Sequence, residues 1–229
     1  MLFEKRISLD PRLSMIAEML GVCECCADIG SDHGRLGAFL LQNGQCSRMC
    51  LTDISDASLQ KARKLIALLG LDAKVDFYVG DGALALKKPV DAAVIAGMGG
   101  ETIAHILENS EDRLNGARIL LQPNVAAPHL RERMNACGWK IINENLVRDG
   151  RRIYMIIEAV QGEQQLSETE KFVGPVILEK KPALLAEYAA FRLRVLKKAL
   201  DGASRGADAE DIALLSHEIA IWAEIAACL

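Results

Sequence analysis

The stretch from Val22 to Arg35, VCECCADIGSDHGR, decides the fold of this chain. An apolar run leads to Asp28, Gly30 breaks it, and helical spacing begins after Gly34. A strand that ends in an acid and a glycine and then turns tightly into a helix forms a ligand-binding crevice in open α/β sheets. The stretch therefore predicts such a sheet with a ligand at this turn. The alternative is an ordinary strand-to-helix turn with two convenient glycines.

The composition is that of an ordinary globular protein. The chain has 229 residues, enough for one complete α/β domain and an appendage. Its formal net charge is −4, so any contact with nucleic acid must come from a local basic patch. Charges interrupt the first residues and no apolar run reaches the roughly 18 residues of a membrane span, so we expect neither a signal peptide nor a membrane contact. The odd number of cysteines, seven, favours a reducing, cytoplasmic location.

Four of the cysteines superficially resemble a zinc ribbon. Cys23 and Cys26 form a C-x-x-C, and Cys46 and Cys50 follow. Thiolate ligands of zinc must converge on one point, and no Gly, Pro or Asn between Cys23 and Cys26 would turn the chain to bring them together. We therefore expect no metal and interpret these cysteines as small hydrophobic side chains of a sheet.

Strand-like runs alternate with helical periodicity along most of the chain, which predicts an α/β, Rossmann-like, doubly wound sheet of seven strands. The last two strands flank Asp149-Gly150, a strong hairpin signal, so they should be antiparallel. The predicted helices are Pro11–Leu20, Leu36–Gln42, Ser55–Leu69, Glu101–Glu108 and Pro128–Cys137. The predicted strands are Val22–Asp28, Arg48–Asp53, Val75–Val79, Asp91–Ile95, Ala117–Leu121, Lys140–Leu146 and Arg152–Ala159.

Acids stand at the ends of the first three strands. Asp53 follows Gly34 by nineteen positions, where an acid can accept hydrogen bonds from the two hydroxyls of a ribose. Asp81 follows the third strand. Asp32 stands where the dinucleotide motif G-x-G-x-x-G has a glycine, and its charge would repel a pyrophosphate. This acidic rim favours a cationic, phosphate-free cofactor such as S-adenosylmethionine over NAD.

Five short motifs are informative beyond the turn's general pattern: Arg12-Leu13, Asp28-Ile29-Gly30-Ser31-Asp32-His33, Gly80-Asp81-Gly82, Ile95-Ala96-Gly97-Met98-Gly99-Gly100 and Leu120-Leu121-Gln122-Pro123-Asn124. The last two together are more specific than the turn. Through these motifs the chain resembles the bacterial tRNA (adenine(22)-N1)-methyltransferase family from about residue 6 to residue 160, and more loosely beyond. In that family a tyrosine and a proline often follow the turn, where this chain has Arg35 and Gly37. If that tyrosine shapes the base pocket, this chain differs in how it handles the substrate base and not in how it binds the cofactor.

The resemblance implies a class I methyltransferase sheet with S-adenosylmethionine at its strand ends. Asp28 and Gly30 would frame the methionine moiety, Asp53 would hold the ribose, and Asp81 would receive the adenine amino group. The alternative for each acid is a helix cap or a solvated loop charge. The expected cofactor-binding residues are Asp28, Gly30, Ser31, Asp32, Asp53, Ile54, Gly80, Asp81, Gly82, Ala96, Gly97 and Met98.

The reaction implied is methyl transfer to N1 of an adenine in tRNA. Adenine N1 carries an in-plane lone pair, so the protein mainly needs to orient the base, after unpairing or flipping it. A proton that the cationic product loses afterwards could go to Asp28, His33 or water. His33 could also contact the base, or it could be a structural residue of the turn. The expected catalytic residues are Asp28, His33 and Asn124, and those for substrate near the cleft are Arg12, Gln122, Pro123 and Asn124, whose two amides can read a base edge. The other histidines, His105, His129 and His217, receive no role.

The C-terminal part is predicted to be a separate helical unit. We divide the chain into a methyltransferase domain, residues 1–161, and a coiled-coil-like domain, residues 162–229. The polar segment Gly162–Lys171 predicts a linker. Apolar spacing then predicts a helix from Leu178 or Ala183 to Leu200 and a second from Ala207 to Ala227, packed as an antiparallel helical hairpin.

Charge is divided between these two predicted helices. Residues 179–198 carry six bases and two acids, whereas residues 208–229 carry five acids and no Lys or Arg. Mutual attraction between paired helices is one interpretation. The other is that four bases of the first helix contact tRNA phosphates. These four are Arg192, Arg194, Lys197 and Lys198.

The favoured function is therefore an S-adenosylmethionine-dependent tRNA (adenine-N1)-methyltransferase, with tRNA as partner and a monomer or weak homodimer as the expected state. Two alternatives remain open. One is a methyltransferase of the same fold that acts on another RNA or on a small molecule. The other is a non-catalytic RNA-binding protein that retains the fold.

Overall fold

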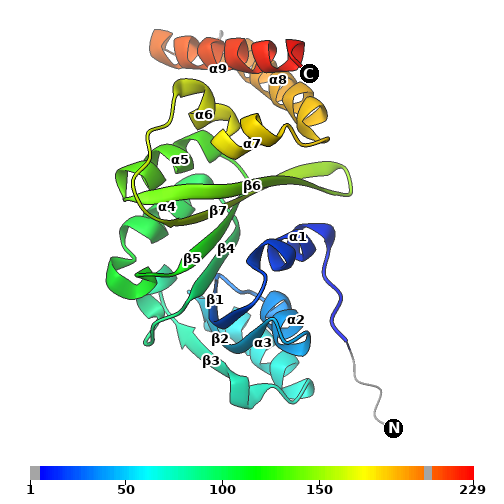
Figure 1. The fold of residues 1–229 in the computed structure, drawn as a ribbon, viewed down its shortest axis with the longest axis vertical. Helices are drawn as coiled ribbons and strands as arrows, with labels where there is room; N and C mark the ends of the chain where they lie inside the picture. The colour runs from blue at the N-terminus through cyan, green and yellow to red at the C-terminus, as the bar shows by residue number, and fades with distance from the viewer. Residues whose placement is uncertain (1–5, 204–207) are drawn as a thin grey trace. The chain divides into compact units, whose positions relative to one another are not determined.

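The computed structural model describes residues 6–203 and 208–229. They fall into two compact units, Met1–Gln165 and Leu166–Leu229. The division lies four residues after the predicted one at 161/162. Each unit is described below by itself (Figure 1).

The first unit is built on one seven-stranded sheet with the strand order β3-β2-β1-β4-β5-β7-β6. Strands β1 to β5 run parallel, and β7 runs antiparallel to both β5 and β6. Asp149 pairs with Arg152 across the turn between β6 and β7, as the hairpin signal predicts. The strands are β1 (Cys23–Ile29), β2 (Cys46–Asp53), β3 (Val75–Val79), β4 (Ala92–Met98), β5 (Arg118–Pro123), β6 (Trp139–Asp149) and β7 (Arg152–Gln161).

Helices flank this sheet and connect its parallel strands (Figure 1). Asp10 caps α1 by accepting a hydrogen bond from the Leu13 amide at 2.8 Å, and Ser55 caps α3 in the same way. The helices of this unit are α1 (Pro11–Leu20), α2 (Arg35–Gln42), α3 (Asp56–Leu68), α4 (Gly100–Glu108) and α5 (Ala127–Ala136), with short 3₁₀ turns η1 (Asp72–Lys74), η2 (Gly82–Ala85) and η3 (Glu111–Leu114).

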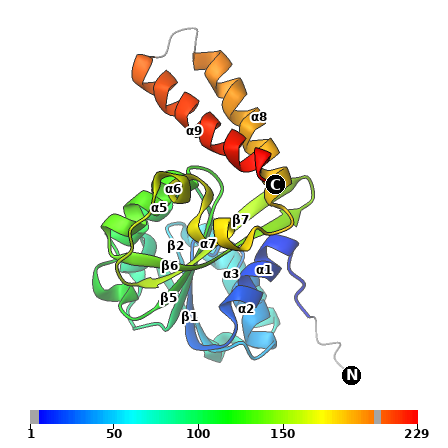
Figure 2. The ribbon, with the colours of Figure 1, turned by 45° about the horizontal axis from the view of Figure 1, so that its top comes forward.

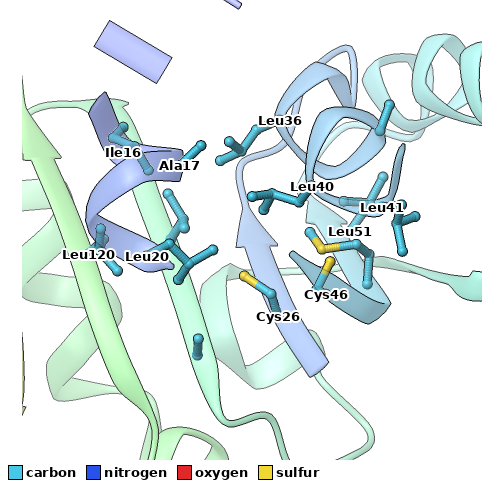
Figure 3. Packing of buried hydrophobic residues seen from close by; sticks show 14 of the residues in the cluster. Ile16, Ala17, Leu20, Cys26, Leu36, Leu40, Leu41, Cys46, Leu51 and Leu120 are labelled. Atoms are coloured by element: carbon cyan, nitrogen blue, oxygen red, sulfur yellow. The ribbon is translucent and has the colours of Figure 1, made fainter. Parts of the chain in front are cut away.

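The core on one face of the sheet lies between helices α1, α2 and α3 and the central strands. Leu20 and Leu40 are fully buried there beside Leu51 of β2 (Figure 3). Burying a leucine contributes about 1.5–3 kcal/mol, so this layer holds the strand ends in place. Cys26 and Cys46 belong to the same core. In the described ranges 6–203 and 208–229, no group of three or more His, Cys, Asp or Glu side chains could hold a metal ion.

Strand β4 continues three residues past its predicted end at Ile95. Its register with β5 shifts between Ala96 and Met98, where Gly97 adopts a φ of +80° that favours glycine. The predicted strand ended early because a glycine in a strand pattern is read as a break. Here the glycine forms a bulge, and pairing with β5 resumes beyond it.

The described residues of the second unit, 166–203 and 208–229, form four helices, and one prediction about this unit is wrong. The segment Gly162–Lys171 is not a linker throughout, because α6 begins within it at Glu168. Ser167 and Glu170 form a capping box, a signature that the spacing S-x-x-E carries and that the polar composition concealed. The helices are α6 (Glu168–Val173), α7 (Pro175–Lys180), α8 (Leu185–Ala203) and α9 (Ala209–Ala227).

Helices α8 and α9 lie side by side in opposite directions, as the hairpin prediction requires (Figure 2). Tyr188 and Trp222 meet edge to face between them, with ring centroids 5.6 Å apart. Lys181, in the left-handed region, and Pro182 separate α7 from α8. Asp208 caps α9, and the predicted first residue of this helix, Ala207, lies outside the described residues. None of the helices in the described part of the chain is both long and apolar enough to cross a membrane.

Candidate active site

A cavity of about 600 Å³ opens at the carboxyl ends of β1, β2 and β4. A volume of this size suits a cofactor or drug-sized ligand. All twelve predicted cofactor-binding residues line it, together with Arg12 and His33. The twelve are Asp28, Gly30, Ser31, Asp32, Asp53, Ile54, Gly80, Asp81, Gly82, Ala96, Gly97 and Met98.

The turn after β1 forms the floor of the cavity. The amides of Gly30 and Ser31 both donate to the carbonyl of Thr52, at 2.9 and 3.0 Å, which joins the ends of β1 and β2. Gly30 has a φ of +76°, and a Cβ there would lie 2.1 Å from the Met98 Cε. The backbone of this turn can therefore approach a ligand closely only because position 30 has no side chain.

Replacing Gly30 with alanine should weaken cofactor binding. The new methyl group forces both a strained φ and a displacement of the Met98 side chain, which lines the cavity. We expect S-adenosylhomocysteine to bind about 10- to 100-fold more weakly by calorimetry, because a few kcal/mol of strain and clash fall on the site. Gly44→Ala is the matched control. It also has a positive φ, of +67°, but its Cβ meets nothing within 4 Å. Equal loss of affinity in both variants would contradict this prediction.

Asp53 connects two loops at the rim of the cavity. One carboxylate oxygen accepts from the Ser55 amide at 2.8 Å and the other from the Asp32 amide at 3.2 Å. Each carboxylate oxygen has a second lone pair. Asp53 therefore orders the loops and still presents acceptors for a pair of ribose hydroxyls.

Asp28 is the buried acid of the site. Burial and, to a smaller extent, the nearby charge of Asp53 raise its pKa, the Arg12 guanidinium lowers it, and the net pKa is about 7. An ordinary aspartate titrates near 4. Asp28 is therefore able to bind or release a proton near neutral pH, and a cation beside it would favour its ionised form.

Asp81 is an exposed acid at the start of η2. Its position is that of a helix cap, yet its side chain makes no capping hydrogen bond. The interpretation of Asp81 as a cap is therefore wrong, and its carboxylate is available to accept from a ligand in the cavity that it lines.

Gln122 is the centre of a hydrogen-bonded network that includes two residues of the cavity lining, Arg12 and Gly97. Its side-chain oxygen accepts from Arg12 at 2.6 Å and from the Gly97 amide at 3.1 Å. Its amide nitrogen donates to Asn124 at 3.1 Å. Gln122 is fully buried, so the predicted reading of a base edge by its amide is wrong. We call these four residues, Arg12, Gly97, Gln122 and Asn124, the Gln122 network.

Asn124 is an exposed member of the Gln122 network. Its side-chain amide donates to the carbonyl of Gly97 at 2.7 Å, and its backbone N–H donates to the carbonyl of Met98 at 2.8 Å. The bulge of β4 is thus held from both sides. Asn124 remains a candidate for base contact, whereas Pro123, buried in β5 opposite Met98, supports the bulge.

His33 and Arg35 lie at the mouth of the cavity. His33 is exposed, and its Nδ1 lies 3.6 Å from the Asp32 carboxylate. Arg35 donates to the backbone carbonyl of Ser8 at 2.6 Å. Arg35 therefore attaches the segment before α1 to the start of α2.

Sequence reasoning missed three residues of α4. Thr102, His105 and Ile106 all line the cavity, although His105 was expected to have no role. Their spacing of i, i+3 and i+4 marks one face of a helix. That spacing, directly after a glycine-rich strand end, is the signal that could have found them.

The four basic side chains of α8 that were predicted to contact tRNA phosphates differ in their surroundings. Arg192 is paired with Glu218 of α9, as the interpretation of mutual attraction requires. Arg194 stacks on Phe191, with 5.6 Å from its guanidinium carbon to the ring centroid. Lys197 and Lys198 are exposed on α8.

The cavity fits S-adenosylmethionine. Its acids, Asp28, Asp32, Asp53 and Asp81, favour a cation. The hydroxyl of Ser31 is buried and has no hydrogen-bond partner among the residues that the structure describes, so it is free for a ligand.

Comparisons with known proteins agree with this geometry. A family model described as tRNA (adenine(22)-N(1))-methyltransferase matches residues 26–224. The tRNA (adenine(22)-N(1))-methyltransferase of Bacillus subtilis (strain 168) is 31% identical over 212 residues, which cover 89% of each chain. A crystal structure of an NADB-Rossmann superfamily protein from Streptococcus agalactiae has a TM-score of 0.89 and 29% identity, over 97% of this chain and 99% of that chain. A crystal structure of Sp1610 from Streptococcus pneumoniae in complex with S-adenosyl-L-methionine has a TM-score of 0.84 and 26% identity, over 94% and 98% of the two chains.

Proposed function

Because this chain belongs to the tRNA (adenine(22)-N(1))-methyltransferase family, we propose that it methylates N1 of adenine 22 in tRNA with S-adenosylmethionine. The observation that carries the proposal is the cavity at the strand ends. The twelve residues expected to bind the cofactor, which are scattered from position 28 to position 98, all line it, and its acids suit a cationic ligand. When bound, S-adenosylmethionine supplies a methyl group on a positively charged sulfur.

The ends of the first four strands would hold the cofactor. Asp53 would accept hydrogen bonds from the ribose hydroxyls, and Asp81 would accept from the adenine amino group. The Ser31 hydroxyl and the close backbone at Gly30 accommodate the methionine moiety. Asp28 adds a carboxylate whose ionised form a cation stabilises.

The Gln122 network would hold the substrate base. Adenine N1 already carries the attacking lone pair, so the site must position the ring and needs no group to deprotonate it. Asn124 is exposed at the bulge and offers an amide to a base edge. Arg12 adds a cation beside the bulge, 3.7 Å from where a Cβ of Gly97 would lie. Asp28 or His33 would exchange a proton if the product requires it.

The proposal is tested by primer extension. Unmodified tRNA carrying adenine 22 is incubated with the protein and S-adenosylmethionine, and reverse transcription should stop one base before that adenine. The same tRNA with guanine at position 22 is the matched control and should give no stop. Absence of a stop on every tRNA that has adenine 22 would reject the proposed function.

We also propose that α8 contacts tRNA phosphates through Arg194, Lys197 and Lys198. Replacing the three with glutamine should lower the slope of log affinity against log salt concentration by about 2 to 3, because each phosphate contact releases counterions. Lys171→Gln, which removes a lysine paired with Glu168 in the same unit, is the control and should leave the slope unchanged. An unchanged slope in the triple variant would contradict the proposed contact.

We further propose that the protein is located in the cytoplasm and that it is a monomer or a weak homodimer. All seven cysteines are free thiols, which suits a reducing compartment where tRNA is processed.

A further inference from the structure

A second, smaller cavity adjoins the first at the start of η2. Four residues line both cavities: Asp81, Gly82, His105 and Ile106. The Asp81 carboxylate, which caps no helix, and the His105 ring therefore border the same corner of the site. No role in the proposed reaction has been given to His105 so far.

The contacts of Asn109 determine which nitrogen of His105 carries hydrogen. The Asn109 amide nitrogen lies 2.8 Å from the His105 backbone carbonyl and 3.2 Å from its Nδ1. A carbonyl only accepts hydrogen bonds, so the Asn109 atom that faces it must be the NH₂ group. The second hydrogen of that group then points to Nδ1, which must accept. The neutral imidazole consequently carries its hydrogen on Nε2, at the far side of the ring from Asn109.

An acceptor and a donor at one corner complement one edge of adenine. The amino group of adenine donates, and each ring nitrogen next to it, N1 or N7, accepts. We propose that His105 is a specificity-determining residue for the cofactor, donating its Nε2 hydrogen to a ring nitrogen beside the amino group that Asp81 accepts. This inference rests on the proposed function, because it assumes S-adenosylmethionine in the cavity.

The pairing explains two features that a purely structural histidine does not. Asn109 already satisfies the last turn of α4 through its bond to the His105 carbonyl, so its second bond, to Nδ1, serves to orient the ring. Ile106, one residue on, contacts Gly82 so closely that a Cβ there would lie 3.0 Å from its side chain. That contact packs α4, which carries His105, against the start of η2, which follows Asp81.

The test uses calorimetry with S-adenosylhomocysteine and its 1-deaza, 3-deaza and 7-deaza analogues. The parent protein should bind either the 1-deaza or the 7-deaza analogue about 10-fold more weakly than S-adenosylhomocysteine, because the hydrogen bond from His105 to that ring nitrogen is lost. His105→Ala should lose about the same factor for S-adenosylhomocysteine and become indifferent to that analogue. His105→Gln, which retains a donor, should recover part of the loss. His129→Ala, on α5 and away from both cavities, is the control.

The outcomes distinguish a failure of the proposed role of His105 from a failure of the proposed methyltransferase function. If the parent protein does not bind S-adenosylhomocysteine, the proposed function itself fails. If binding is normal and His105→Ala loses the same factor for every analogue, the histidine acts only through the fold and the inference is overturned. Thermal denaturation of each variant shows whether a loss of affinity reflects unfolding. Asn109→Ala removes the bond that orients the His105 ring, so this variant should also discriminate less between S-adenosylhomocysteine and the same analogue, by a smaller factor than His105→Ala.

Discussion

Gln122→Met should lower kcat for tRNA methylation by about 100-fold while changing the affinity for S-adenosylhomocysteine by less than about threefold. Methionine has a similar volume but cannot accept from Arg12 and the Gly97 amide or donate to Asn124. The bulge and Arg12 then lose their common anchor. A displacement of about 1 Å at the reacting groups can cost about two orders of magnitude in rate. Single-turnover methylation and calorimetry together measure the two quantities.

The control for this prediction is Gln161→Met, the same change at the end of β7. Gln161 bonds the Gly116 amide and the Asn115 side chain at the surface of the sheet, away from the cavity. It should leave both kcat and cofactor affinity within about twofold of the parent. A Gln122 variant that loses cofactor affinity as much as kcat would show that the Gln122 network serves the cofactor side, against the assignment made above.

Asp28→Asn should make the free protein more stable at pH 8 and at the same time weaken binding of S-adenosylmethionine. The folded-state pKa of Asp28, about 7, is raised above its unfolded value near 4. Its stabilising contribution is therefore complete below about pH 4 and is lost as the pH rises through 7. A difference of about three pKa units corresponds to about 4 kcal/mol at most. Asparagine avoids the buried charge, so the two proteins should differ in unfolding free energy mainly above pH 4.

Comparing the variant with the parent isolates Asp28 from the other carboxylates that titrate in acid. Denaturant titrations from pH 4 to pH 8 should show the gap growing with pH, and S-adenosylmethionine should bind the variant at least about 10-fold more weakly at pH 8, because a carboxylate facing a cation has been lost. Asp76→Asn is the opposite control. Lys88 and Arg48 lower the Asp76 pKa, so its loss should destabilise the protein at neutral pH. A gap for Asp28→Asn that does not change with pH would refute the prediction.

The twelve predicted residues of the cofactor cavity could be found from sequence because they lie at strand ends or directly after them. In a parallel sheet all such ends meet at one edge, so a pattern that locates the strands also brings together Asp28, Asp53 and Asp81. The acids that follow the predicted strands therefore indicate the acidic rim, whereas the cavity residues that α4 contributes were missed.

The second unit shows where local patterns conflict. Average polarity predicted a linker over 162–171, while the capping box at Ser167 and Glu170 starts a helix inside it. The cap prevails because it satisfies backbone groups that would otherwise be unpaired.

By itself, then, the sequence determined the order of the elements, the acidic rim and the family to which the chain belongs. Only the tertiary structure decided that Gln122 is an anchor and no base reader, that Arg35 attaches the segment before α1, and that His105 faces the cofactor cavity. The physical reason is distance along the chain. Arg12 and Gln122 are 110 positions apart, and whether an amide is buried and satisfied depends on partners that no local pattern specifies.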